Sequence, residues 1–142
     1  MVNLLDKNAR QEIVEAIRRA ESRTSGEIRV HVAKKCGEDV LGRARKIFMK
    51  LGMHRTKQRN GVLIFVALDS RFFAIVGDSG IHHAVGDSFW SGVRDKMAEC
   101  FRKGGIREGI LAGVAGVGEK LERYFPVGSA DRNELPDTVT GG

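Results

Sequence analysis

The sequence predicts an α/β protein, a three-layer α/β/α sandwich with a small mixed sheet and its elements in the order αβαββαα. Residues 62–68 form an unbroken apolar run rich in β-branched types, which is typical of a central strand buried on both faces. Segments with helical periodicity stand before and after this run along the chain. Because a strand with two apolar faces needs helices above and below the sheet, three layers are expected.

The first helix is predicted over residues 7–23, where apolar residues recur at helical spacing. Asp6 or Asn8 can cap its start. Residues 27–32 then alternate strictly, with Ile28, Val30 and Val32 facing one way and Glu27, Arg29 and His31 facing the other. Such alternation predicts a half-buried strand near the edge of a sheet.

A second helix is predicted from Glu38-Asp39 to Gly52, with an apolar face that includes Ala44, Ile47 and Phe48. The seven-residue apolar strand follows after a polar, basic loop. Only Asp69 and Ser70 separate it from a second apolar strand, so we expect a tight antiparallel hairpin. The strand–helix–strand unit before the hairpin predicts a right-handed crossover and parallel pairing.

Two more helices are predicted from the periodicity of residues 85–101 and 107–124. The last one carries four glycines, and glycine lowers helix stability. Their number therefore predicts that a neighbouring backbone approaches this helix closely. Pro126 stops it, and the polar residues that follow have no period. We therefore expect one domain over residues 1–126 and a disordered tail over residues 127–142.

The net charge of +6 is concentrated in residues 34–59, where nine basic residues against two acidic ones give a local charge of +7. This basic face predicts contact with a protein partner or an anionic lipid through Arg43, Arg45 and Lys46, and a solvated helix face is the alternative. Aromatic residues for base stacking are not interleaved there, so no nucleic acid partner is expected.

Composition also predicts the compartment. Cys36 and Cys100 show no metal-binding spacing and are expected to be free thiols in a reducing environment. No stretch reaches the roughly 18 apolar residues of a transmembrane helix, and the first residues do not resemble a signal peptide. A cytoplasmic protein without a transmembrane segment is therefore expected.

Acidic and amide side chains at the strand ends are the candidate metal ligands. Parallel strands end at one shared edge of the sheet, whereas the last strand of the hairpin runs back to the opposite edge, about 20 Å away. The carboxyl edge holds Glu38, Asp39 and Asp69, and the opposite edge holds Glu27, Asn60, Asp78, Ser79 and Asp87. Oxygen ligands are typical of Ca²⁺ or Mg²⁺. Helix caps and turns are the alternative roles for the aspartates.

Residues 60–81 resemble the core signature of TPM domains: an Asn-Gly-Val-Leu strand, an Asp-x-Arg turn, a second strand and a glycine-bearing loop. Upstream, Thr24-Ser-Gly-Glu-Ile-Arg-Val is similar to the first strand of that family. Downstream, the segment Phe101-Arg-Lys-Gly-Gly-Ile-Arg-Glu-Gly-Ile110 resembles its loop before the last helix. The resemblance covers about residues 7–126.

The resemblance implies an α/β/α sandwich and several activities. Thylakoid members are associated with acid phosphatase activity and photosystem II repair, animal members act on acetylcholine receptors, and some bacterial members are similar to calcium-binding proteins. Asp78 stands where many members carry an aromatic residue, which adds an oxygen ligand.

Three hypotheses follow. The first is a domain that binds a divalent cation, Ca²⁺ rather than Mg²⁺, and regulates or scaffolds a protein partner, for which a membrane-associated protein is one candidate. The second is a metal-assisted acid phosphatase in which Arg59 or Arg71 stabilises phosphoryl charge, with no nucleophile assigned. The third is a basic-surface module for a protein or a lipid.

Overall fold

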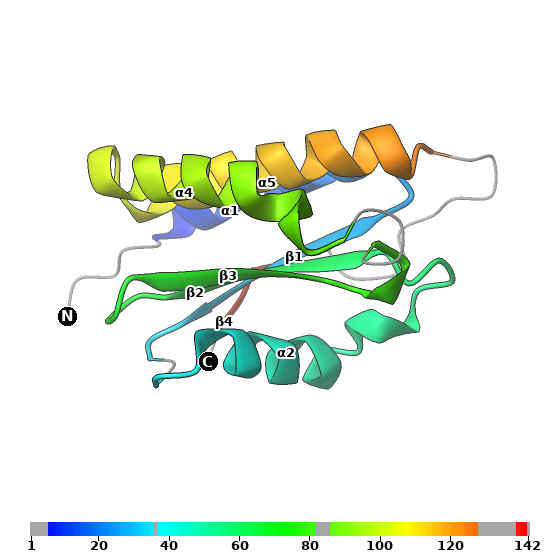
Figure 1. Ribbon diagram of the computed structural model, residues 1–142. Coiled ribbons are helices and arrows are strands. Elements are labelled where there is room, and N and C mark those ends of the chain that lie inside the picture. Colours follow the sequence, from blue (N-terminus) through cyan, green and yellow to red (C-terminus); the bar gives the residue numbers. More distant parts are fainter. Residues whose placement is uncertain (1–5, 36, 82–85, 128–138, 142) are drawn as a thin grey trace.

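The computed structural model describes residues 6–35, 37–81, 86–127 and 139–141, and these form three layers (Figure 1). Three helices cover one face of a central sheet, and one helix covers the other. The covering helices are α1 (Lys7–Glu21), α4 (Ser91–Lys103) and α5 (Ile106–Tyr124), opposite α2 (Val40–Lys50). The predicted α/β/α sandwich is therefore confirmed.

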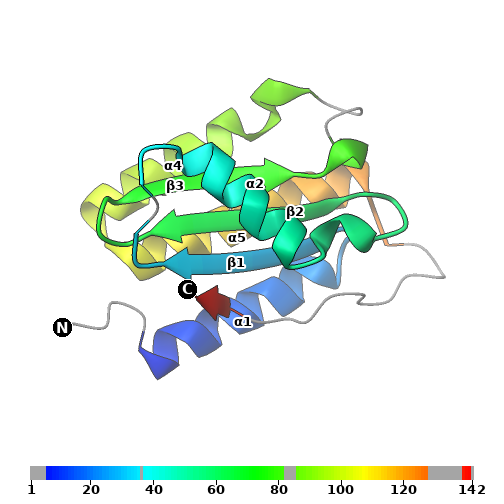
Figure 2. The same ribbon diagram turned by 90° about the horizontal axis from the view of Figure 1, so that it is seen from below.

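The sheet has the strand order β3-β2-β1-β4 (Figure 2). Its strands are β1 (Glu27–Ala33), β2 (Gly61–Ala67), β3 (Phe72–Gly77) and β4 (Val139–Gly141). β1 and β2 are parallel, and β2 and β3 are antiparallel, as the sequence predicts. The mixed character of the sheet follows directly from the crossover helix α2 and the hairpin.

The strand β4 differs from the sequence-based expectation of a disordered tail. It lies within residues 127–142 and pairs in parallel with β1, with Val139 opposite Val30. Residues 128–138 of the expected tail lie outside the described residues. Three residues carry too little periodicity to predict a strand, and their partner lies more than 100 positions earlier in the chain.

The hairpin between β2 and β3 has a longer turn than the expected two residues. β2 ends at Ala67 and β3 begins at Phe72, so the turn contains Leu68, Asp69, Ser70 and Arg71. The backbone amides of Leu68 and Asp69 donate to Ala33 and Lys34, each at 2.9 Å. These bonds continue the parallel pairing of β2 with β1 beyond the end of both strands.

Aspartate caps fix the start of the first two helices. The Asp6 carboxylate accepts a hydrogen bond from the Ala9 amide at 2.8 Å, which selects Asp6 over Asn8 as the cap of α1. Asp39 caps α2 in the same way. The third predicted helix is divided into a short 3₁₀ helix, η2 (Asp87–Trp90), followed by α4, and Val85 of its predicted pattern lies outside the described residues.

The core lies on both faces of the sheet. On the face of α1, α4 and α5, Ile28, Val62 and Ile64 pack with Ile13 and Leu121. On the α2 face, the core contains Leu63, Phe65, Ala44 and Phe48. β2 is buried along its whole length, as its unbroken apolar sequence predicts.

The glycines of α5 permit the close packing that the sequence predicts. A Cβ atom on Gly109 would lie 2.1 Å from the Phe101 ring, and one on Gly118 would lie 2.6 Å from Ala20. Gly113 makes the same approach to Met97. Alanine at these positions would collide with α4 or α1, so α5 packs directly against both helices.

Candidate functional site

The topology separates the candidate ligands into two groups at opposite edges of the sheet. The turn that carries Asp69 follows β2, and the loop that leads to Glu38 follows β1, so both stand at the carboxyl edge of this parallel pair. β3 runs back, and the amide of Asp78 donates to the carbonyl of Gly61, the first residue of β2. Asp69 and Asp78 therefore lie at opposite edges of the sheet.

At the amino edge, Asp78 forms a two-point ion pair with Arg59. Arg59 Nε donates to Oδ2 at 2.8 Å, and Nη2 donates to Oδ1 at 3.0 Å. The backbone amide of Ser79 also donates to Oδ1, at 2.7 Å. The hydrogen bond and the negative charge of Asp78 raise the pKa of Arg59. With its charge compensated in this way, Asp78 connects two loops and does not fit a cation ligand.

The backbone reinforces this connection. Arg59 adopts a left-handed conformation with φ of 52°, and its carbonyl accepts from the Gly80 amide at 2.9 Å. A Cβ atom on Gly80 would lie 2.1 Å from the Gln58 carbonyl oxygen, so only glycine allows this approach. The loop before β2 and the loop after β3 thus close on each other.

The other amino-edge candidates are buried. Asn60 is 1% exposed and donates from Nδ2 to Ser25 Oγ at 3.1 Å. Glu27 is 3% exposed at the start of β1. The side chain of Asp87 lies outside the described residues. Among the described residues, neither of these two buried side chains belongs to a group of three or more histidine, cysteine, aspartate or glutamate side chains that could hold a metal ion.

At the carboxyl edge, backbone hydrogen bonds hold the hairpin turn beside the loop after β1. They are the bonds from Leu68 and Asp69 to Ala33 and Lys34 described above. Asp69 and Glu38 are exposed. Asp39 is a helix cap, because its Oδ1 accepts from the Gly42 amide at 2.9 Å. Cys36, in the same loop, lies outside the described residues.

Within the described ranges, no group of three or more histidine, cysteine, aspartate or glutamate side chains stands close enough to hold a metal ion. A cation at the carboxyl edge would therefore need main-chain carbonyls or water in addition to the carboxylates. Such mixed oxygen shells are usual for Ca²⁺.

Arg71 lines a small cavity of about 160 Å³ at the carboxyl edge, together with Val66, Phe101, Gly105 and Ile106. Gly105 precedes α5, a helix whose N-terminus has no side-chain cap. The positive side chain of Arg71 and the positive end of the α5 dipole therefore lie at the same cavity. The structure thus brings together two segments of the family resemblance that lie about 30 positions apart, the Asp-x-Arg turn and the segment that begins at Phe101.

A row of polar residues on β1 is more deeply buried than the sequence predicts. Glu27, Arg29 and His31 were expected on the exposed side of a half-buried strand, yet all seven residues of β1 are buried. His31 stacks on Phe65 with their ring centroids 5.9 Å apart. Desolvation lowers the pKa of His31, and the charges of Arg43, Arg29 and Lys50 lower it further. Alternation alone identified this row, but it did not reveal that the row is buried.

The three basic candidates on α2 are all exposed, and they do not share one environment. Arg45 lines a groove along β3, whereas Arg43 acts electrostatically on His31. Lys46 is on the same helix, outside the residues that line that groove. None of the helices described in the structure is long and apolar enough to cross a membrane.

Comparison with known proteins places these features in context. Residues 1–120 match the family model described as the TPM domain. The NMR structure of the BA42 protein from the psychrophilic bacterium Bizionia argentinensis has 42% sequence identity and a TM-score of 0.92, over 100% of this chain and 98% of that chain. The solution NMR structure of the N-terminal domain of a P. gingivalis protein has 25% identity and a TM-score of 0.70, over 85% of this chain and 79% of that chain. No curated protein matches the chain.

Proposed function

Because this chain belongs to the TPM-domain family, we propose that it is a divalent-cation-binding domain whose site is the carboxyl edge of the sheet. The observation that carries the proposal is the pair of backbone hydrogen bonds from Leu68 and Asp69 to Ala33 and Lys34. They fix the exposed Asp69 on the same edge as the loop with Glu38. Two carboxylates on adjoining loops, completed by main-chain carbonyls and water, would supply the ligands of a hard-cation site.

The proposed cation is Ca²⁺ in preference to Mg²⁺. Calcium accepts six to eight oxygen ligands in flexible geometry, including carbonyls and water. Magnesium requires near-ideal octahedral geometry, which loop carboxylates on two different segments supply less readily. Asp78 is a less suitable Ca²⁺ ligand than Asp69, because its carboxylate is paired with Arg59.

The proposed role is regulation or scaffolding of a protein partner. The loop after β1 leads directly into α2, the helix that carries the exposed Arg43, Arg45 and Lys46. A cation that joins this loop to the hairpin turn would restrict the start of α2 and change the local charge. Cation binding would thereby affect the basic face of the molecule.

A titration followed by NMR tests the proposal. Ca²⁺ should shift the amide signals of residues 33–39 and 67–71, and Asp69→Asn should weaken binding at least tenfold. Asp95→Asn on α4 removes the same charge from an exposed position and should leave the affinity unchanged. Shifts that are absent from both loops, or that survive Asp69→Asn together with Glu38→Gln, would contradict the proposal.

A metal-assisted acid phosphatase is the second candidate, favoured by Arg71 beside the uncapped start of α5. That arrangement suits an anionic phosphoryl oxygen, with a metal-activated water as nucleophile. Arg59, the other arginine predicted for this role, is bound to Asp78. Hydrolysis of p-nitrophenyl phosphate with Ca²⁺ or Mg²⁺ between pH 4 and 8 should be lost in Arg71→Gln. No hydrolysis under any of these conditions would eliminate this candidate.

A further inference from the structure

The strand β3 forms one full-length edge of the sheet. Among the described strands, it has a neighbour on one side only, so alternate amide and carbonyl groups of its outer side face away from β2. Edge strands usually carry charged residues, proline or a bulge that prevents pairing with another chain. β3 reads Phe-Phe-Ala-Ile-Val-Gly and has neither a charged residue nor proline. This edge is therefore able to accept a further strand.

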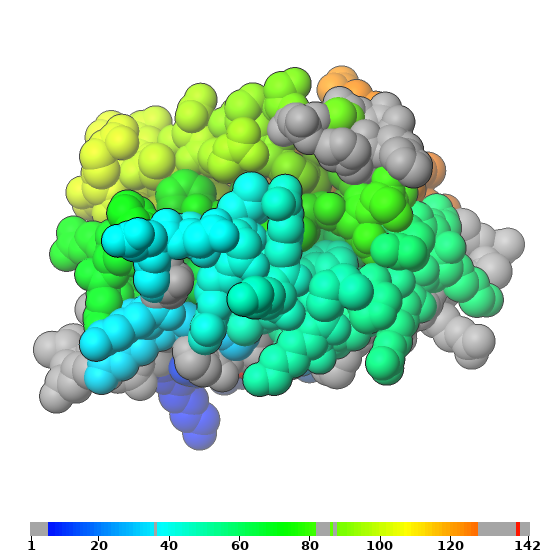
Figure 3. Space-filling view, turned by 60° about the horizontal axis from the view of Figure 1, so that its bottom comes forward, coloured from blue at the N-terminus to red at the C-terminus, as the bar shows by residue number. Residues whose placement is uncertain are grey.

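The outer side of β3 lies in a groove of about 520 Å³ between two helical walls. Figure 3 shows the hollow between α2, drawn in cyan to teal, and the yellow-green α4. β3 supplies the floor from Phe73 to Gly77. Val40 and Leu41 belong to one wall, and Trp90 belongs to the other. Among the described residues, the groove reaches β3 from Phe73 to Gly77. Its two walls restrict the approach of a broad, flat surface.

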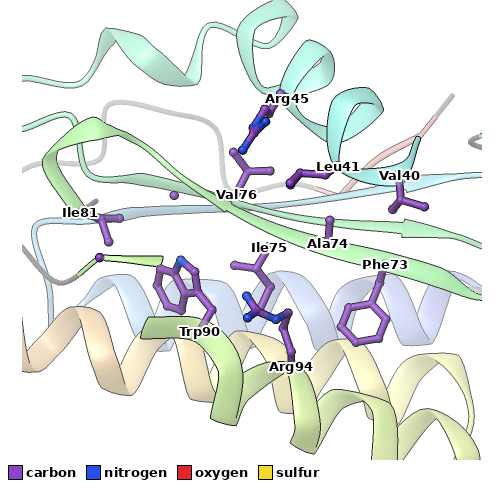
Figure 4. Close-up of a pocket in the computed structure, with 12 residues that line it drawn as sticks. Val40, Leu41, Arg45, Phe73, Ala74, Ile75, Val76, Ile81, Trp90 and Arg94 are labelled. Atoms are coloured by element: carbon purple, nitrogen blue, oxygen red, sulfur yellow. The ribbon is translucent and has the colours of Figure 1, made fainter. Parts of the chain in front are cut away.

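The groove has two cations, one from each wall. Arg45 comes from α2 and Arg94 from α4, and both side chains extend towards β3 (Figure 4). The described lining residues include no acidic side chain. The wall formed by α2 also belongs to the segment of residues 34–59 with its local charge of +7. A ligand that pairs with β3 would therefore meet positive charge on both sides.

We propose that β3 binds an extended, acidic segment of a partner protein, which adds to the sheet as a further strand. The backbone of the segment would pair with the outer side of β3, and its carboxylates would contact Arg45 and Arg94. Six residues of β3 offer about 20 Å of pairing, which a segment of six or seven residues would fill. Alternate side chains of the segment would lie against the apolar walls.

The shape of the groove favours a peptide over the other acidic ligands. A planar lipid surface would contact the exposed arginines of α2 but could not reach the backbone of β3 between the two walls. Single-stranded nucleic acid would need a series of exposed aromatic faces. Trp90 is only 6% exposed, and Phe72, which is 51% exposed, is not among the lining residues of the groove. This proposal uses the flank of the sheet and is independent of a cation at the carboxyl edge.

The test uses the seven-residue peptide Val-Val-Glu-Glu-Val-Val-Glu, offered to the whole chain. Its adjacent glutamates point to opposite faces of an added strand, so a carboxylate meets each wall. Trp90 is the single tryptophan and lies in the groove, so its fluorescence reports binding. Binding should shift the amide signals of β3 and protect its outward-facing amides from hydrogen exchange. Arg45→Glu with Arg94→Glu should weaken the affinity at least tenfold. Lys46→Glu with Arg102→Glu makes the same charge change on the same two helices, outside the lining residues, and should have a smaller effect.

Two further probes separate strand addition from simple charge attraction. The same peptide with every backbone nitrogen methylated keeps every carboxylate but has no backbone N–H on either edge to donate to β3, and it should not bind. Vesicles that contain phosphatidylserine test the lipid alternative. Equal binding of the methylated peptide, equal loss from both pairs of charge reversals, or vesicle binding without peptide binding would each overturn the proposal. Circular dichroism of each variant confirms that loss of binding is not loss of fold.

Discussion

Arg59 and Asp78 lie 19 positions apart and join the loop before β2 to the loop after β3 through two hydrogen bonds of 2.8 and 3.0 Å. The Asp78 side chain is 6% exposed and that of Arg59 is 48% exposed. The carboxylate is therefore buried beside a guanidinium that still reaches solvent. This relationship makes Asp78 a structural residue of the amino edge, and it leads to the first two predictions.

Asp78→Asn should lower the free energy of unfolding by about 1–2 kcal/mol. This is less than most hydrogen bonds to charged groups contribute, because solvent screens the exposed Arg59. Urea unfolding followed by circular dichroism measures the change. Asp95→Asn, at an exposed position on α4, should stay within about 0.5 kcal/mol of the parent chain. Unchanged stability in Asp78→Asn would show that the ion pair does not hold the two loops together.

Replacing Arg59 separates the ion pair from the backbone conformation. Arg59→Ala and Arg59→Gly both remove the guanidinium, but only glycine adopts a φ of 52° without a steric penalty. Arg59→Gly should therefore be more stable than Arg59→Ala by about 1 kcal/mol. Equal stabilities in urea unfolding would indicate that the loop changes conformation when the side chain is removed.

Gly80→Ala should destabilise the protein by more than about 2 kcal/mol, because its Cβ would collide with the carbonyl oxygens of Gln58 and Arg59. Backbone atoms cannot move aside as a flexible side chain can. Gly92→Ala is the matched control, since a Cβ there meets nothing within 4 Å. That substitution should raise stability by about 0.5 kcal/mol. Thermal unfolding of the two variants should move in opposite directions.

Asp39→Ala should cost about 1 kcal/mol, because α2 loses the cap that accepts from the Gly42 amide. The adjacent Glu38→Ala should cost less than about 0.5 kcal/mol, since Glu38 is an exposed side chain. Chemical unfolding in the absence of added metal measures both. A loss of equal size from the two residues would argue against a capping role specific to Asp39.

Stability should fall as the pH drops below about 6.5, the ordinary pKa of histidine, because His31 is held below that value in the folded state. Between pH 6.5 and the pKa of folded His31, this histidine is protonated in the unfolded chain but neutral in the folded chain. The stability that neutral His31 contributes is therefore fully present above pH 6.5 and is lost as the pH falls towards the folded pKa. His31→Phe keeps the ring stacked on Phe65 and should weaken this pH dependence.

An NMR titration of the His31 ring provides the direct measurement. Arg43→Gln should raise the midpoint of the His31 titration, because Arg43 has the largest electrostatic effect among the charges that lower the pKa of His31. Lys46→Gln, on the same helix, should have a smaller effect. A midpoint at or above 6.5 in the parent chain would contradict the prediction.

The local elements of this fold could be predicted from the sequence because they depend on local patterns. The unbroken apolar run of β2, the helical spacing around Ile13 and the short distance between β2 and β3 each specify an element within a few residues. The burial of β1 could not be predicted in this way. His31 and Arg29 are buried on a strand that is paired on its outer side with β4, which begins at Val139.

The surroundings of the candidate ligands could likewise be predicted only in part from local sequence patterns. Their division between two edges follows from strand direction, which the sequence predicts. The ion pair of Asp78 depends on the left-handed backbone of Arg59 and on the close approach of Gly80, neither of which leaves a local sequence signal. The groove between α2 and α4 likewise arises from packing of distant helices against one strand.

The unequal length of the two outer strands has a consequence for stoichiometry. β4 contains three residues and β3 contains six, so the sheet has one short edge strand and one long edge strand. Very short border strands give little backbone pairing to an incoming chain. A sheet of this kind can extend in one direction only. Complexes formed through it should stop at one added strand per molecule, or at a closed pair of molecules, and should not grow into a fibre.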